Sequence, residues 1–263
     1  MKRLHRSILL GIVPSLALSC GASSDSATEH VRNSNERIAG ADPFVDRLDQ
    51  LDDGLWAVSH GWKNGPYTVN DWRRENVKID RGIELTLSAR ADDPTVFSSG
   101  EIQSHDTYGH GYFETSMQAA RGSGIITGFF TYTGPPFGKP WNEIDIEILG
   151  SQPTKLAATY FRGDQKVSSM IELGFDASRG THHYAFDWQP GWIRWFVDGQ
   201  LVHEAMGDDL PLPNTQQKIM LHLWGTELLH EWAGRFNHHA LPATARFHCI
   251  AYSSQRPARA ACL

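Results

Sequence analysis

Residues 141–150, which read WNEIDIEILG, constrain the fold more than any other part of this chain. Acids and isoleucines alternate through the run, with Glu143, Asp145 and Glu147 at every second position. Successive side chains of a β-strand point to opposite faces of its sheet, so the run predicts one strand with an acidic and an apolar face. We therefore expect the three acids to stand in a row above a sheet while the isoleucines pack beneath it.

A row of acids on a strand is typical of a glycosidase site. Retaining glycosidases hold two carboxyl groups about 5–5.5 Å apart, and inverting ones hold them roughly 6.5–9.5 Å apart. Glu143 and Glu147 have Cα atoms roughly 13 Å apart on an extended strand, and two long side chains that lean together on a curved sheet close that gap. Crowded like charges also raise the pKa of at least one acid, which keeps a proton donor available near neutral pH. The alternative is a solvated strand face with ordinary surface acids.

The region between residues 41 and 253 predicts many short strands and no long helix. Residues 198–199 (DG) indicate a hairpin turn, with residues 200–204 as the returning strand. The other apolar or alternating runs, punctuated by Gly, Pro, Asp and Asn, are residues 83–88, 111–117, 183–188 and 192–197. This pattern favours an all-β fold, a two-sheet antiparallel β-sandwich.

Composition indicates one medium-sized domain with no nucleic-acid partner. The 263 residues are 40% hydrophobic and 21% charged, which suffices for a two-layer core. A formal net charge of −6 argues against nucleic acid and anionic membrane surfaces as partners. Nine Trp, twelve Phe and seven Tyr favour a surface on which sugar rings stack, although core packing explains most aromatic residues in a β protein.

The amino terminus predicts export. Basic residues precede the apolar stretch 8–18, so residues 1–19 are interpreted as a signal peptide, too short for a membrane span. Cys20, followed by glycine, resembles a bacterial lipid-attachment site, whereas residues 17–19 (ALS) also fit ordinary signal cleavage. The protein is accordingly expected at the cell envelope or outside the cell. Residues 20–40 are expected to form a flexible tether, and residues 254–263 a C-terminal tail.

Two further cysteines leave a structural choice open. Cys249 and Cys262 either pair across a short loop, or remain unrelated thiols with Cys249 buried in a final strand and Cys262 fraying. No metal-binding spacing joins the cysteines to the histidines, and the adjacent pairs at 182–183 and 238–239 cannot both face one ion from a strand. We expect no catalytic metal and no cofactor.

The acid triplet and its surroundings resemble family 16 of the glycoside hydrolases over roughly residues 44–252. Residues 143–147 (EIDIE) match the family signature, and residues 98–104, 108–114, 129–135, 173–180 and 184–191 are similar to bacterial lichenases, which cut mixed-linkage β-1,3-1,4-glucan. Gln103 and residues 223–227 (LWGTE) are instead similar to bacterial endoglycanases that trim exopolysaccharides such as succinoglycan. The resemblance implies a jelly roll with a concave substrate cleft, and we expect a monomer acting on β-glucan.

The resemblance also assigns roles to residues. It implies that Glu143 is the nucleophile, Glu147 the acid/base and Asp145 a helper in a retaining double displacement. Trp141 is expected to pack a sugar beside the nucleophile, or else to be a rim tryptophan in the core. Glu101 is expected to accept hydrogen bonds from sugar hydroxyls, or else to be an exposed strand acid. The other residues expected to line the cleft are Trp62, Asn64, Gln103, Phe130, Tyr132, Phe161, His222 and Trp224.

Several positions depart from the lichenase pattern. Asn70 and Ser99 stand where lichenases commonly carry a disulfide, and His248 stands where they carry a calcium-binding Asp. Lichenases typically have Asn, Tyr, Arg and Asn at four cleft positions that are occupied here by Thr159, Phe161, Gln103 and His222. These departures affect the expected linkage preference more than the expected hydrolysis.

The sequence thus favours an endo-acting, retaining β-glucanase that cuts β-1,4 bonds in mixed-linkage glucan. An exopolysaccharide endoglycanase and a transglycosylase that uses the same covalent intermediate are the alternatives. A non-catalytic glycan-binding sandwich fits less well, because such a protein does not need an intact acid triplet.

Overall fold

Strands are the main secondary elements of the structure, a computed structural model that describes residues 37–208 and 210–263. The expected signal peptide, Cys20 and most of the expected tether lie outside the described residues. Ile38, close to the start of the described chain, donates a backbone hydrogen bond to His110 Nδ1 at 2.8 Å. Within the described ranges, no helix is long and apolar enough to cross a membrane.

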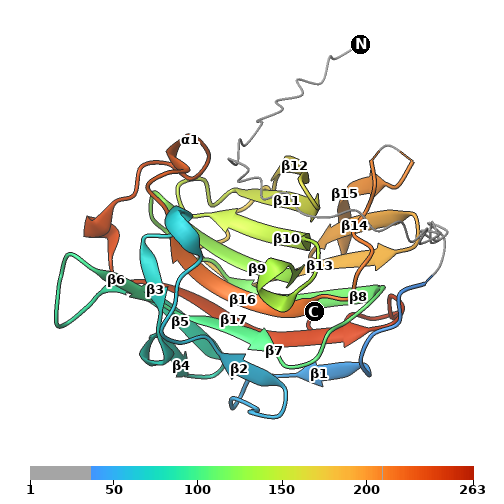
Figure 1. The fold of residues 1–263 in the computed structure, drawn as a ribbon, viewed down its shortest axis with the longest axis horizontal. Coiled ribbons are helices and arrows are strands. Elements are labelled where there is room, and N and C mark those ends of the chain that lie inside the picture. The colour runs from blue at the N-terminus through green and yellow to red at the C-terminus, as the bar shows by residue number, and fades with distance from the viewer. Residues whose placement is uncertain (1–36, 209) are drawn as a thin grey trace, which may run out of the picture. The chain divides into compact units, whose positions relative to one another are not determined.

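Ten strands form the first sheet (Figure 1). They are β1 (Phe44–Asp46), β3 (Asn70–Trp72), β4 (Val77–Ile79), β5 (Ile83–Ala89), β6 (Phe97–Ser99), β8 (Gly111–Gln118), β13 (His182–Gln189), β14 (Trp192–Val197), β15 (Gln200–Met206) and β17 (Ala243–Ser253). The order is β15-β14-β13-β8-β17-β5-β6-β3, with β1 paired to β17 and β4 paired to β5. Apart from the parallel pair β3 and β6, the neighbours run antiparallel.

Seven antiparallel strands form the second sheet, in the order β12-β11-β10-β9-β16-β7-β2. They are β2 (Trp56–Val58), β7 (Glu101–Ser104), β9 (Ile125–Thr133), β10 (Asn142–Leu149), β11 (Lys155–Arg162), β12 (Gln165–Glu172) and β16 (Lys218–Gly225). In Figure 1 the labels β12, β11, β10, β9 and β16 follow one another across this sheet. Short helical segments connect strands, namely α1 (His230–Ala233) and the 3-10 turns Gly65–Tyr67, Arg74–Asn76, Pro135–Phe137 and His238–Ala240.

The core lies between the two sheets and takes the apolar face of each strand. Ile144, Ile146 and Ile148 of β10 are fully buried there, as the alternation of acids and isoleucines predicts. Fully burying one such side chain contributes about 1.5–3 kcal/mol. From the ten-stranded sheet, β5 contributes Leu85 and β13 contributes Trp188 to the same core. The predicted all-β, two-sheet antiparallel sandwich is confirmed.

The predicted hairpin is also present between β14 and β15. Asp198 and Gly199 both have positive φ angles, 47° and 77°. Two successive residues with positive φ are the requirement of a type I′ turn, whose twist matches that of the flanking strands.

The C-terminal tail is fixed to the ten-stranded sheet. Cys249 of β17 and Cys262 form a disulfide, so the pairing alternative is the one observed, and two unrelated thiols with a fraying Cys262 are not. The carboxylate of Glu114 accepts hydrogen bonds from the backbone N–H groups of Ala261 and Cys262 at 2.9 and 3.0 Å. His183 Nε2 lies 2.9 Å from the same carboxylate. The tail therefore lies against the outward side chains of β8, β13 and β17.

Candidate active site

The three acids of β10 stand in one row, opposite the face whose isoleucines are buried. Because β10 lies between β9 and β11, each acid has two cross-strand neighbours. Glu143 faces Tyr132 and Phe161. The other acids pair across the sheet as Asp145 with Phe130 and Thr159, and Glu147 with Gly128 and Ala157. The nucleophile candidate is thus bordered by aromatic rings and the acid/base candidate by small residues.

The backbone of β10 is held from beneath at the middle acid. Trp195 of β14, buried in the core, donates from Nε1 to the carbonyl oxygen of Asp145 at 3.0 Å. This bond joins the two sheets directly under the acid row. A buried N–H left without a partner costs about 1–3 kcal/mol, so the bond favours one position of β10 relative to the ten-stranded sheet.

Trp141 connects an exposed aromatic surface to Glu143. Its Nε1 donates a short hydrogen bond to Glu143 Oε2. Its ring stacks on Phe161, with centroids 4.8 Å apart and planes at 13°. The Trp141 side chain is 41% exposed, so the alternative of a tryptophan in the core is wrong. A flat apolar surface therefore borders the nucleophile candidate, which suits a sugar face.

Proton affinities divide unequally between Glu143 and Asp145. Burial, followed by the charges of Glu143 and Glu147, raises the pKa of Asp145 well above its usual value. Burial also raises the pKa of Glu143, to about 7, although hydrogen bonding from Trp141 and from Asp145 limits that rise. Asp145 therefore holds the shared proton of the pair, and Glu143 is the group that ionises first, at a pH near 7. An ionised carboxylate next to a protonated acid is the arrangement that a carboxylate nucleophile requires.

Glu101 is buried within a polar chain. Glu101 is only 1% exposed, so the alternative of an exposed strand acid is wrong. Ser59 Oγ donates to Glu101 Oε1 at 2.6 Å, and Gln103 Nε2 donates to the Ser59 hydroxyl at 3.2 Å. Burial raises the pKa of Glu101 to about 8. Glu101 is therefore mostly protonated at neutral pH.

Aromatic side chains continue from Glu101 across β16. The His222 ring lies 4.3 Å from that of Phe130 and 5.9 Å from that of Trp224. Burial lowers the pKa of His222. The Trp224 ring in turn lies 6.2 Å from that of Trp232, a residue of α1. This side of the sheet therefore carries a row of rings that leads away from the acids.

Trp62 and Asn64 meet at the outer end of this aromatic row. Trp62 is 44% exposed and packs its edge against Trp72, with centroids 6.3 Å apart. Asn64 Oδ1 accepts a hydrogen bond from Trp72 Nε1 at 3.2 Å. The structure thus brings the expected cleft residues to the acid-bearing sheet and its borders.

Three contributors to this surface were not predicted. Trp72 stacks on His222, Ser59 binds Glu101, and Lys166 of β12 places Nζ 5.3 Å from the centre of the Phe161 ring. The charge of Lys166 lowers the pKa of Glu143 and of Asp145. Only Lys166 had a sequence signal, since it is the single cation of an alternating strand. Ser59 and Trp72 come from short segments without a distinctive pattern.

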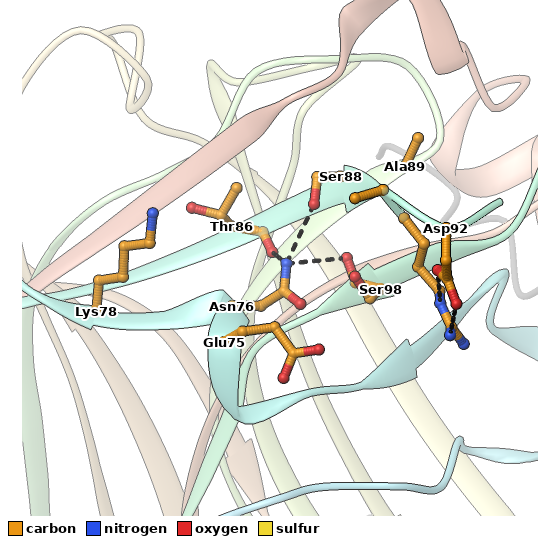
Figure 2. A pocket seen from close by; sticks show the side chains of 10 residues that line it. Glu75, Asn76, Lys78, Thr86, Ser88, Ala89, Asp92 and Ser98 are labelled. Carbon is orange, nitrogen blue, oxygen red and sulfur yellow. Dashed lines mark hydrogen bonds and ion pairs between the residues drawn. The ribbon is translucent and has the colours of Figure 1, made fainter. Parts of the chain in front are cut away.

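A hollow of about 430 Å³ lies elsewhere, on the outward side of β5 (Figure 2). Asn76 Nδ2 donates there to the Thr86 carbonyl and lies within hydrogen-bond distance of Ser88 Oγ and the Ser98 carbonyl. None of the ten residues that line it is aromatic. Sugar faces stack on aromatic rings, so the acid-bearing surface suits a glycan better than this hollow does.

The positions that depart from the lichenase pattern have other partners. Asn70 Oδ1 accepts from Gly225 N at 3.0 Å, and Ser99 Oγ donates to the Leu223 carbonyl, so both hold β16. His248 Nδ1 lies 2.8 Å from the Arg81 carbonyl. In the part of the chain that the structure describes, no three His, Cys, Asp or Glu side chains are arranged to hold a metal ion.

Comparisons with known proteins agree with this geometry. Residues 64–241 match the model of the family described as glycosyl hydrolases family 16. A β-glucanase of Bacillus licheniformis is 37% identical over 254 residues, which are 96% of this chain and 99% of that protein. The endo-1,3-1,4-β-glycanase ExoK of Rhizobium meliloti is 38% identical over 199 residues, 74% of this chain and 73% of that protein. A solved B. licheniformis β-glucanase structure superposes with a TM-score of 0.77 at 38% identity, over 81% of this chain and 98% of that one.

Proposed function

Because the chain belongs to family 16 of the glycosyl hydrolases, we propose that it cleaves β-1,4 bonds inside mixed-linkage β-1,3-1,4-glucan and retains anomeric configuration. It is a glycoside hydrolase, and the β-glucanases among its relatives support a β-glucan substrate. The observation that carries the mechanism is the row on β10, with Glu143 and Glu147 on one face and Asp145 between them.

The proposed reaction has two steps. In the first, the Glu143 carboxylate attacks the anomeric carbon while Glu147 gives its proton to the departing glycosidic oxygen, so a glycosyl ester forms as the glycosidic bond breaks. In the second, Glu147 takes a proton from water, and the water oxygen displaces Glu143 from the anomeric carbon. Asp145 keeps its own proton throughout and donates a hydrogen bond to Glu143, which favours the ionised nucleophile at the start and the release of its carboxylate at the end.

Retention is tested by proton NMR of the first products. The β anomer should form first and convert slowly to the α anomer by mutarotation. Initial formation of the α anomer would remove both the covalent intermediate and the assigned roles.

The roles of the two glutamates are tested by azide rescue. E143A and E147A should each lower turnover by about 10²–10⁴-fold or more, since nucleophilic and acid/base contributions are both lost. Azide added to E143A can enter the vacated face and give an α-glycosyl azide, whereas in E147A it intercepts the glycosyl-enzyme and gives the β product. The same azide anomer from both variants contradicts the assignment.

The substrate is tested with a panel of polymers. Mixed-linkage glucan should be cut readily, laminarin weakly and carboxymethylcellulose negligibly. The physical reason is shape, because a β-1,3 bond bends the flat ribbon that pure β-1,4 glucan forms. Faster cleavage of laminarin than of mixed-linkage glucan contradicts the proposed linkage preference and leaves the family assignment intact.

An exopolysaccharide of similar backbone is the second candidate substrate. The observation that favours it is Gln103, which is tied to Ser59 at a position where lichenases typically carry Arg, together with the similarity to ExoK. Succinoglycan belongs in the same panel for this reason. Analysis of early products for chains longer than the substrate separates hydrolysis from transglycosylation, which differ in whether water or a sugar attacks the intermediate.

We also propose that the protein acts outside the cytoplasm. The support is the basic and apolar segment 1–19 and the Cys20-Gly21 pair. Mass spectrometry of the protein purified after expression of the full chain decides between a lipid on Cys20 and plain cleavage of the signal peptide before or near Cys20. An uncleaved amino terminus on protein found only in the cytoplasmic fraction contradicts export.

A further inference from the structure

His222 occupies a place on the sheet between two carboxyl groups. Its Nδ1 lies 3.9 Å from Glu101 Oε2, and its Nε2 lies 3.9 Å from Glu147 Oε1. His222 is 8% exposed, and both of its ring nitrogens are buried without a hydrogen-bond partner. A buried polar atom without a partner is costly, so these two nitrogens need an explanation in the function of the site.

The strand register creates this arrangement. Glu101 of β7 pairs with His222 of β16, His222 pairs with Gly128 of β9, and Gly128 pairs with Glu147 of β10. A Cβ atom on Gly128 would lie 2.3 Å from His222 Nε2. The missing side chain at Gly128 is therefore what allows the imidazole to extend across β9 toward Glu147.

Packing fixes the plane of the imidazole. Trp72 stacks on His222 with centroids 6.1 Å apart and planes at 12°, and Phe130 covers it at 4.3 Å. The ring cannot turn away from the line between the two carboxyl groups without displacing these side chains. Such packing is how a group that acts through hydrogen bonds is held in place.

The protonation states give this row one direction of hydrogen bonding. Burial keeps His222 neutral near pH 7 and keeps Glu101 protonated, with a pKa of about 8. Ser59 Oγ already donates to Glu101 Oε1, which leaves the Glu101 proton on Oε2, facing Nδ1. The second nitrogen, Nε2, then carries the hydrogen and faces Glu147. The series of hydrogen bonds therefore runs, from donor to acceptor, from Gln103 through Ser59, Glu101 and His222 to Glu147.

Among the described residues, the other charged groups near the acid row do not take the place of His222 beside Glu147. Glu143 and Asp145 face Glu147 along β10, and Lys166 acts on those two acids from β12. The cross-strand neighbours of Glu147 on β9 and β11 are Gly128 and Ala157, which carry no polar group. Among the described residues, no Lys or Arg lies within 4.0 Å of Glu147.

We propose that His222 is a positioning residue that donates from Nε2 to Glu147 and is itself oriented by the Glu101 carboxyl group. The donation occupies Oε1 and leaves Oε2 to carry the proton exchanged with the glycosidic oxygen and with water. The 3.9 Å separations shorten when substrate binds, as hydrogen bonds at catalytic sites commonly do between the free enzyme and its complex. This inference rests on the proposed acid/base role of Glu147.

Two amide variants separate the nitrogens of His222. The amide of H222Q reaches near the place of Nε2 and keeps a donor toward Glu147, whereas the shorter amide of H222N stays near Nδ1 and loses it. H222N should lower kcat on the polymer by about 10- to 100-fold, a part of the usual acid/base contribution, with little change in KM. H222Q should lose less, and only H222N should move the pH profile of kcat. Equal losses in both variants, or losses confined to KM, contradict the proposal.

The leaving group gives a second readout. A dinitrophenyl β-glycoside needs no proton for departure, so the rate of glycosyl-enzyme formation from it should be the same in H222N and the unmodified protein. If H222N slows this step as much as it slows polymer cleavage, His222 acts on something other than proton transfer. Thermal unfolding of each variant identifies losses caused by misfolding.

The ring nitrogens of His222 can be observed without any turnover. Nitrogen-15 NMR of the labelled protein should show a neutral ring with its hydrogen on Nε2 at pH 7, and E101L, but not E101Q, should change that state because the Gln amide can still donate to Nδ1. A hydrogen on Nδ1, or a charged ring, overturns the proposal. If the unmodified protein prefers another β-glucan, the substrate proposal fails and the kinetic comparison is made on that polymer. The NMR result stands in either case.

Discussion

At the scale of a single residue, Trp141 links the aromatic surface beside the acids to the ionisation of Glu143, the proposed nucleophile. Its indole N–H lowers the pKa of Glu143, while its ring extends the stacking surface of Phe161. In W141F the ring remains and the donor is lost, so the pKa of Glu143 should rise. The proposed mechanism requires ionised Glu143, so the acid limb of kcat/KM should move to higher pH. At pH values below the acid limb, kcat/KM of W141F should be about 10-fold lower than that of the unmodified protein, as expected for the loss of one hydrogen bond to a charged group.

The matched control is F161L, which keeps the indole donor and removes its stacking partner. It should raise KM and leave the acid limb in place. An acid limb that moves equally in both variants would mean that stacking, rather than the hydrogen bond, controls Glu143.

Residues within one strand were more predictable than the partners that other strands bring to them. Alternation along β10 predicted the orientation of Glu143 and Glu147 because neighbouring side chains of one strand have a fixed geometry. Ser59 and Trp72 reach the site only through the order and register of the sheet. Nothing in the local sequence at those two positions indicates a partner more than forty residues away for Ser59, or a histidine of β16 for Trp72.

At the scale of elements, the C-terminal tail acts as a strap across the ten-stranded sheet. The Cys249–Cys262 disulfide closes a short loop with a sequence separation of 13 residues. Glu114 holds the same segment through two backbone N–H groups. C262S should lower the free energy of unfolding by about 3 kcal/mol, the loop-closure value for a loop of this length.

The measurement is urea unfolding of C262S beside C249S. The activity of both variants on polymer should match that of the unmodified protein, because the strap contacts the ten-stranded sheet and the acids project from the seven-stranded one. A large loss of activity at unchanged stability contradicts this separation of the strap from the site. The sequence left the pairing open because spacing alone does not show whether the last residues return to the sheet.

At the scale of the whole molecule, the order of the strands buries the carboxyl group of Glu101 away from water. The sequence predicted two sheets, because each strand has one apolar face that another layer must cover. It did not predict that β7, which carries Glu101, and its neighbour β16 would belong to the same sheet as β10, since strand order is set by long-range pairing. Burial of that carboxyl links global stability to pH.

Glu101 should make the folded protein less stable as pH rises. Its pKa is about 8 in the folded state and 4.5 ordinarily, so its stabilising contribution is fully present below about pH 4.5 and is lost as pH approaches 8. The free energy of unfolding should fall by about 1.4 kcal/mol per pH unit across that window from this group alone. The amide of E101Q stays neutral, so the free energy of unfolding of this variant should lack that slope. Between pH 4.5 and pH 8, E101Q should gain about 4 kcal/mol in free energy of unfolding relative to the unmodified protein.

Asp145, whose pKa is also raised, titrates in both proteins and cancels in the comparison. Urea unfolding at several pH values measures the difference, with E172Q on an exposed position of β12 as the control. Parallel stability curves for E101Q and the unmodified protein would show that Glu101 ionises inside the fold at its ordinary pH.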